Sequence, residues 1–292
     1  MMRAGTHRAI GYSTIGAFVG TGLPGRIDVM TRRDWIRATV LALGGWLTMG
    51  WDVLAAEPAA PDPRLFELRI YTAHQGKLDP LLERFRKHTC AIFARNGMTN
   101  IGYWTPIDNP DSKLYYILAY PDKAARDAAW KAFAADPEWT AARTDSEKNG
   151  ALVAKVESIF LQAADFSPKI APSAPGSPRV FELRTYTAES GRLPNLLERF
   201  RKHTVALFER HGMTNFGYWT KAAGQPGADT TLVYFLAHKS KEAGEASFKA
   251  FRSDPEWVAA KEASEKAAGG PLTVKDGVQS ILMVPTDFSP AR

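Results

Sequence analysis

The sequence has a single cysteine, Cys90, among its 292 residues. One cysteine excludes an intrachain disulfide and any cysteine-rich metal site. The motifs of zinc hydrolases (HExxH), serine hydrolases (GxSxG), dinucleotide-binding domains (GxGxxG) and P-loop enzymes are also missing. Although the formal net charge is +6, the chain has no run of Lys and Arg and no basic helix with interleaved aromatic residues. We therefore expect no metal, no cofactor and no nucleic-acid partner.

Long apolar runs are scarce, and a notable one lies near the N-terminus. Arg32 and Arg33 precede an uncharged run over 38–51, and small residues follow at 55–56. This order is typical of a secretory signal, and the paired arginines resemble a twin-arginine signal. The run is short for a membrane span. We expect 30–56 to be a twin-arginine-type signal peptide, with export to the periplasm and no stable membrane span after cleavage. An uncleaved anchor and a cytoplasmic N-terminal helix are the alternatives.

Residues 1–29 precede Met30, which stands directly before the signal-like segment. They are rich in Gly and Thr and have no clear period. We expect 1–29 to be a mis-annotated leader, added by the choice of start codon, or a disordered segment.

A long segment of the sequence occurs twice. "FELRIYTAHQGKLDPLLERFRKHTCAIFARNGMTNIGYWT" at 66–105 returns as "FELRTYTAESGRLPNLLERFRKHTVALFERHGMTNFGYWT" at 181–220, with 29 identities in 40 positions. "DPEW" and "DFSP" also return later in each copy. The sequence therefore predicts two domain-sized repeats, 64–168 and 179–290, joined by a Pro/Ser/Gly linker at 169–178.

Each repeat predicts the element order β-α-β-β-α-β. In the first repeat, periodicity and turn residues predict strands at 65–71, 98–105, 113–120 and 153–161, a helix from Leu78 to the Asn96-Gly97 stop, and a helix over 123–148 that breaks near Pro137. This order is typical of the ferredoxin-like α+β fold, with both helices on one face of an antiparallel sheet.

Two such sheets in one chain can face each other as an intrachain pseudo-dimeric α/β barrel. The first strand alternates Phe66, Leu68 and Ile70 with more polar residues. We expect the apolar set to face the helices, and Glu67 with its neighbours at 69 and 71 to face a partly polar barrel interior.

The motifs "FELRIYT", "GM…GYW" and "DPEW" resemble the NIPSNAP family, and the resemblance covers both repeats. It implies a dimeric α/β-barrel fold of the ferredoxin-like type. The wider superfamily includes cofactor-independent monooxygenases, isomerases, dehydratases and haem-degrading enzymes, so the fold does not select a reaction.

His88 and His203 are the candidate catalytic residues. Each lies at the rim of the apolar stripe of its helix, where an imidazole can reach a cleft or pack against the sheet. Imidazole titrates near neutral pH, which suits general acid/base work. A purely structural role is the alternative, and a haem ligand at His88 is a third reading by analogy with the superfamily.

The candidate substrate-binding residues come in pairs, one per repeat. Four lie on the first strands: Arg69, Arg184, Tyr71 and Tyr186. Four lie on the second strands: Asn100, Asn215, Trp104 and Trp219. An arginine in the barrel interior could hold a carboxylate, and aromatic rings could line an apolar ligand site. The alternatives are an Arg–Glu pair that ties the strands together and ordinary aromatic packing.

We expect Asn100 and Trp104 to share one face of the second strand, opposite Tyr103. The repeats also differ: His238 replaces Tyr120, and His211 replaces an asparagine. Such differences favour two pockets that have diverged.

Two functions fit these patterns. The first is a small-molecule enzyme or binding protein with its pocket between the first helix and the sheet, using histidine as acid/base in monooxygenase- or isomerase-like chemistry. The second is a non-catalytic binding or assembly module, in which the barrel mediates homo-oligomer formation. Convergent polar groups at a cavity favour the first, and a filled apolar interior favours the second.

Overall fold

The computed structural model describes residues 60–170 and 179–292. The predicted leader, the signal peptide and most of the predicted linker lie outside these residues. The first repeat contains β1 (Leu65–Ala73), α1 (Leu78–Arg84), α2 (Cys90–Arg95), β2 (Thr99–Pro106), β3 (Lys113–Tyr120), α3 (Lys123–Ala135), α4 (Pro137–Ser146) and β4 (Val153–Ala163). The second repeat contains β5 (Val180–Ala188), α5 (Leu193–Arg199), α6 (Val205–Arg210), β6 (Thr214–Lys221), β7 (Thr231–His238), α7 (Lys241–Arg252), α8 (Pro255–Ala267) and β8 (Thr273–Pro285).

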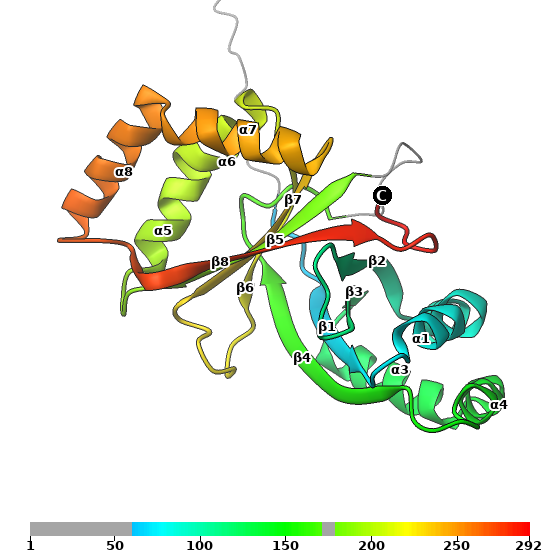
Figure 1. Cartoon of the computed structure of the whole chain (residues 1–292). Helices are drawn as coiled ribbons and strands as arrows, with labels where there is room; N and C mark the ends of the chain where they lie inside the picture. The colour runs from blue at the N-terminus through cyan, green and yellow to red at the C-terminus, as the bar shows by residue number, and fades with distance from the viewer. Residues whose placement is uncertain (1–59, 171–178) are drawn as a thin grey trace, which may run out of the picture. The chain divides into compact units, whose positions relative to one another are not determined.

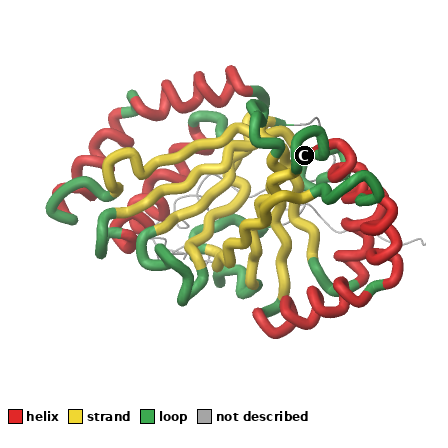
Figure 2. Tube along the Cα trace, turned by 60° about the horizontal axis from the view of Figure 1, so that its bottom comes forward, coloured by secondary structure: helices red, strands yellow, loops and turns green. Residues whose placement is uncertain are grey.

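The eight strands form a closed antiparallel barrel in the order β1-β3-β2-β8-β5-β7-β6-β4. Each repeat supplies four neighbouring strands, and the halves join where Trp104 pairs with Pro285 and where Leu161 pairs with Lys221. The helices of each repeat cover the outside of their own half, as Figures 1 and 2 show. The predicted pseudo-dimeric α/β barrel of two ferredoxin-like units is therefore confirmed.

The barrel interior is apolar, which corrects the predicted orientation of the first strands. One cluster of apolar side chains fills it, including Phe66, Leu68, Trp104, Phe181, Leu183, Trp219 and Phe235. Glu67 points the other way, towards α3, where it contacts Arg126 and Trp130. The prediction of a partly polar interior was wrong because both faces of β1 and β5 are largely buried, so alternation alone does not identify the helix-covered face.

The repeated "DPEW" motif starts the last helix of each repeat. Asp136 accepts hydrogen bonds from the backbone N–H groups of Glu138 and Trp139 at 2.9 and 3.2 Å, and Pro137 occupies the first turn. Asp254 caps α8 by accepting from the backbone N–H of Glu256 at 2.9 Å. A capping aspartate followed by proline is a strong helix start, so the predicted break near Pro137 is confirmed.

The predicted first helix is continuous from α1 to α2 but contains a π-helical turn at Phe85–Thr89, with a second such turn at Phe200–Thr204. Both turns have the sequence "FRKHT". The Thr89 hydroxyl donates to the carbonyl oxygen of Arg84 at 3.2 Å, five residues back. π-Turns occur often at functional sites, and this one contains His88 and follows directly after Arg84.

The repeated "DFSP" motif links the two repeats. Asp287 forms a bidentate ion pair with Arg86, at 2.7 Å for both contacts, and Asp165 pairs with Arg201 in the symmetric position. The ring of Phe288 lies 5.4 Å from the ring of Tyr103 in the other repeat. Each repeat therefore extends its C-terminal arm onto the first helix of its partner repeat.

Candidate functional site

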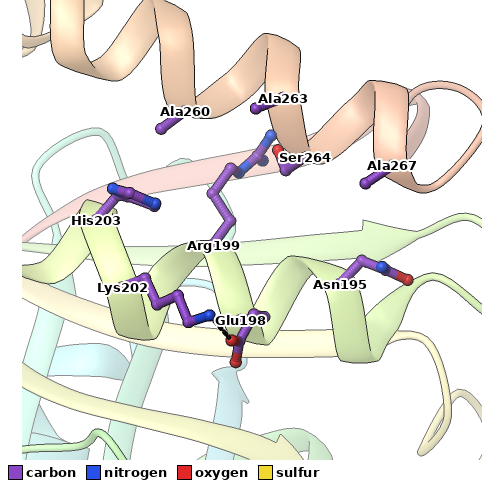
Figure 3. A pocket seen from close by; sticks show the side chains of 9 residues that line it. All are labelled: Asn195, Glu198, Arg199, Lys202, His203, Ala260, Ala263, Ser264 and Ala267. Carbon is purple, nitrogen blue, oxygen red and sulfur yellow. Dashed lines mark ion pairs between the residues drawn. The ribbon is translucent and has the colours of Figure 1, made fainter.

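A groove of about 180 Å³ lies on the outside of the second repeat, between α5 and α8. Figure 3 shows the Arg199 side chain rising from α5 towards α8 and ending beside Ser264, with His203 at one end of the groove and Asn195 at the other. Its remaining lining residues are Glu198, Lys202, Ala260, Ala263 and Ala267. Charged groups from one helix therefore face small apolar side chains from the other.

Arg199 is the unusual residue of this groove. It is 6% exposed, yet Nε and Nη1 form no hydrogen bond within residues 60–170 and 179–292. The nearest carboxylate oxygen, Oε1 of Glu265, lies 3.7 Å from Nη1. Burial without a close acceptor lowers the pKa of the guanidinium, because desolvation disfavours its charged form. A buried arginine that lacks hydrogen-bond acceptors is destabilising unless something else supplies them.

The first repeat has an equivalent groove of about 230 Å³, but its arginine is paired. Nη1 of Arg84 donates to Oε1 of Glu147 at 2.9 Å and to Oγ of Ser146 at 3.2 Å. This groove also contains Asp145, whose counterpart in the second repeat is Ala263. The two grooves thus share a shape but differ in charge.

The length of the last helix explains the difference. In the first repeat α4 ends at Ser146, so Glu147 leaves the helix and turns towards Arg84. In the second repeat two additional residues lie before the next strand, and α8 continues to Ala267. Glu265 stays within the helix and cannot approach Arg199 as closely.

The two predicted catalytic histidines line these two grooves. Nδ1 of His88 lies 3.6 Å from Oε1 of Glu138, and its side chain is 40% exposed. His203 has no hydrogen bond or ion pair with any described residue, and it lies one helical turn after Arg199. The structure therefore brings each histidine next to an arginine, but not next to the other predicted site residues.

The predicted substrate-binding arginines belong to buried networks beneath the helices. Glu67 is fully buried and accepts hydrogen bonds from Arg69 at 2.6 Å, Arg126 at 2.7 Å, Ser158 at 2.6 Å and Tyr120 at 3.1 Å. These donors outweigh the desolvation of the carboxylate, and they lower the pKa of Glu67 to about 2. Arg69 therefore does not face the barrel interior, contrary to the prediction.

The second repeat has a sparser version of this network. Glu182 accepts from Arg184 at 2.6 Å, and its other carboxylate oxygen lies 2.9 Å from Nε2 of His238. Gly244 and Phe248 replace the Arg126 and Trp130 of the first repeat. His238 is 2% exposed and fills the space beside Gly244. His238, which stands in place of Tyr120, thus compensates for the absence of an arginine equivalent to Arg126.

The predicted tyrosines are packed under the first helices. The Tyr71 ring lies 5.2 Å from the Tyr116 ring, and its hydroxyl accepts from Arg69 at 3.3 Å. Tyr186 makes the equivalent contacts with Tyr234 and Arg184. Aromatic rings, including those of Phe85 and Phe93, occupy the layer between the first helix and the sheet. The expected pocket in this layer is therefore replaced by a packed core.

The predicted asparagine and tryptophan sites are separated from each other. Trp104 and Trp219 lie in the apolar barrel interior. Asn100 instead accepts a hydrogen bond from the Tyr103 hydroxyl, and Asn215 accepts one from the Tyr218 hydroxyl. The prediction that Asn100 shares a face with Trp104 was wrong because a β-bulge between Asn100 and Gly102 reverses the alternation.

Sequence reasoning missed Arg199 and Lys202 as site residues. The available signal was spacing: Arg199 and His203 stand four residues apart on one helix, which places them on the same side. The two arginines differ in their pairing because α8 is longer than α4, and the repeated sequence does not show where α8 ends.

Among residues 60–170 and 179–292, no group of three or more His, Cys, Asp or Glu side chains is arranged to hold a metal ion. No helix in these ranges is both long and apolar enough to span a membrane.

A closed barrel of two fused ferredoxin-like halves, each covered by its own helices, defines a protein of the dimeric α/β-barrel class. The NIPSNAP family matches residues 66–168 and again 181–290. The chain belongs to this family and contains two copies of its domain.

Several known proteins are similar to this chain in sequence or in fold. NipSnap homolog 3B of Mus musculus is 24% identical over 242 residues, which are 82% of this chain and 90% of that protein. The structure of a candidate monooxygenase from Fusobacterium nucleatum has a TM-score of 0.50 at 9% identity and covers 78% of this chain and 93% of its own. An anthrone oxidase-like protein has a TM-score of 0.51 at 12% identity and covers 77% of this chain and 92% of its own. At these identities the two structures establish similarity of fold alone.

Proposed function

We propose that this protein binds a small molecule in the groove between α5 and α8 of its second repeat. The observation that carries the proposal is Arg199, a buried guanidinium that lines the groove and lacks hydrogen-bond acceptors among the described residues. Retaining such a group without a partner costs stability, and a ligand that supplies acceptors would offset that cost. His203 stands beside it and is able to exchange a proton with the same ligand.

The enzymatic form of this proposal is a cofactor-independent reaction in which His203 acts as acid or base. The support is the joint position of Arg199 and His203 in one groove, where an arginine could orient an anionic substrate beside an imidazole. Monooxygenase- and isomerase-like reactions both need such a proton transfer. The similarity to the candidate monooxygenase is one of fold and does not choose between them.

A non-catalytic assembly module is the second candidate, and the filled barrel interior favours it. The closely packed apolar cluster around Trp104 and Phe235, whose rings lie 5.0 Å apart, is what a structural barrel would contain. A closed barrel leaves no strand edge for pairing, so a homo-oligomer would use outer surfaces. Sedimentation of the purified chain would test this: a stable oligomer whose assembly is unchanged by groove substitutions would favour the module.

A substitution that fills the groove tests the binding proposal. Ala263 is exposed on α8, so Ala263→Trp should block the groove without disturbing the core. Asp145→Trp is the matched control, because it fills the equivalent position of the first groove. We expect native mass spectrometry to detect a co-purifying small molecule on the wild type and on Asp145→Trp, and to detect none on Ala263→Trp. Equal ligand occupancy in Ala263→Trp would contradict the proposal.

We also propose that the protein is exported to the periplasm by a twin-arginine-type signal. The support is the order of Arg32 and Arg33, the apolar run and the small residues at 55–56. Replacing both arginines by lysine should leave the protein in the cytoplasmic fraction, whereas the wild type should reach the periplasmic fraction. A wild-type protein that stays in the cytoplasm would show that the segment is not such a signal.

A further inference from the structure

The two grooves differ in how closely their arginine is paired with a carboxylate. Both grooves contain the same Lys–Glu pair on the first helix: Lys87 with Glu83 at 2.7 Å, and Lys202 with Glu198 at 2.6 Å. Because both grooves contain this pair, it does not contribute to the difference in charge between them. What remains is an arginine in each groove, together with the acidic groups in or just after the last helix.

In the first groove one carboxylate contacts the arginine, and a second lies at the groove's surface, where it pairs with Lys148. Glu147 is hydrogen-bonded to Arg84 at 2.9 Å, and Asp145 lines the groove. In the second groove Ala263 replaces Asp145, and Glu265 lies 3.7 Å from Arg199 without a hydrogen bond. The second groove therefore has a positive charge that the protein does not neutralise closely, whereas the first groove supplies its own anion.

The walls of the second groove restrict the anion further. Ala260, Ala263 and Ala267 form an apolar side opposite the arginine, and the groove of about 180 Å³ is smaller than a site for a drug-sized ligand. A guanidinium presents its N–H donors in a planar fork that matches the geometry of a carboxylate. A small molecule with one carboxylate and a compact apolar body would complement both walls.

We infer that the groove between α5 and α8 binds a small organic carboxylate, with its anionic group on Arg199 and its apolar body against the alanines of α8. The equivalent groove of the first repeat does not bind it, because the carboxylate of Glu147 already binds Arg84, and Asp145 adds a negative charge at the groove's surface. This inference rests on the proposed binding function. It adds that the ligand is a carboxylate and that only one groove per chain binds it.

The test is calorimetric titration of the full chain with benzoate and with benzamide, which has a similar shape but no charge. We expect one benzoate site per chain and benzamide binding at least about tenfold weaker. Ala263→Asp, which introduces the acidic residue of the first groove, should weaken benzoate binding by about three- to tenfold. Asp145→Ala is the matched control and should leave the affinity unchanged.

Two more variants keep the test informative if Ala263→Asp disturbs α8. Arg199→Met should abolish benzoate binding, and Arg84→Met should not change it. The inference is overturned if benzamide binds as tightly as benzoate, if Ala263→Asp and Arg199→Met both leave binding intact, or if benzoate does not bind at millimolar concentrations. If the wild type co-purifies with a neutral molecule that is absent from Ala263→Trp, the ligand is not a carboxylate but the groove does bind a small molecule. A ligand that Ala263→Trp does not displace would instead refute the groove as the binding site.

Discussion

Replacing Glu67 by glutamine should destabilise the protein strongly at neutral pH and much less in acid. Glu67 is fully buried on β1 and receives hydrogen bonds from side chains of four elements: β1 itself, β3, α3 and β4. Glutamine has nearly the same shape but cannot carry the negative charge. The substitution therefore leaves the buried guanidinium of Arg69 and the partly buried guanidinium of Arg126 near a neutral amide, and uncompensated buried charge is costly.

The pKa of Glu67 sets the magnitude. Its carboxyl falls from an ordinary value of 4.5 to about 2 in the folded protein. Because each pKa unit corresponds to about 1.4 kcal/mol, the ionised carboxylate contributes about 3 kcal/mol to folding at neutral pH. A group with a depressed pKa stabilises the fold above its unfolded pKa, and that contribution disappears as the pH falls through its folded pKa. The contribution should thus decline between about pH 5 and pH 2.

Urea unfolding of wild type and Glu67→Gln, followed by tryptophan fluorescence, measures this difference. We expect about 3 kcal/mol at pH 7 and about half of that at pH 3. In thermal unfolding the loss at neutral pH corresponds to about 6–12 °C for a domain of this size. Glu182→Gln is the matched control, and its effect should be smaller because fewer donors surround that carboxylate. A difference that is the same at pH 7 and pH 3 would refute the electrostatic reasoning.

Further predictions concern the groove arginines and the barrel interior. Arg84→Met should lower the unfolding free energy by about 1–3 kcal/mol in urea unfolding, because it breaks the pair with Glu147. Arg199→Met should leave the unfolding free energy unchanged or raise it, because Arg199 has no close acceptor. Equal losses in the two variants would argue against the difference between the grooves. Gly102→Ala should lower the unfolding free energy by about 1–3 kcal/mol, since a Cβ atom there would lie 2.3 Å from the Trp104 ring in a packed interior. An unchanged melting temperature for Gly102→Ala would show that the interior is loosely packed.

The fold was predictable because the same pattern of strands and helices occurs twice along the sequence. The same βαββαβ pattern occurs in both copies, and the capping aspartate before Pro137 marks the helix break. The orientation of the strands was not predictable in this way. Both faces of β1 are buried, and the polar Glu67 and Arg69 satisfy each other beneath α3 instead of facing the interior.

The candidate site was only partly predictable. The sequence identified His88 and His203, and both do line grooves. It did not reveal that these grooves lie between two helices, because that depends on how the last helix packs against the first. The asymmetry between Arg84 and Arg199 arises from the longer α8, a difference of a few residues whose effect is three-dimensional.

The most direct test of the account is a site-resolved measurement on the arginines. The Nε–Hε signals of Arg199 and Arg84 can be followed by NMR while benzoate is added to the full chain. The account predicts that the Arg199 signal shifts and saturates while the Arg84 signal stays fixed, because Glu147 already occupies Arg84. Equal shifts at both arginines, or a shift at Arg84 alone, would contradict the claim that the second repeat contains the ligand groove.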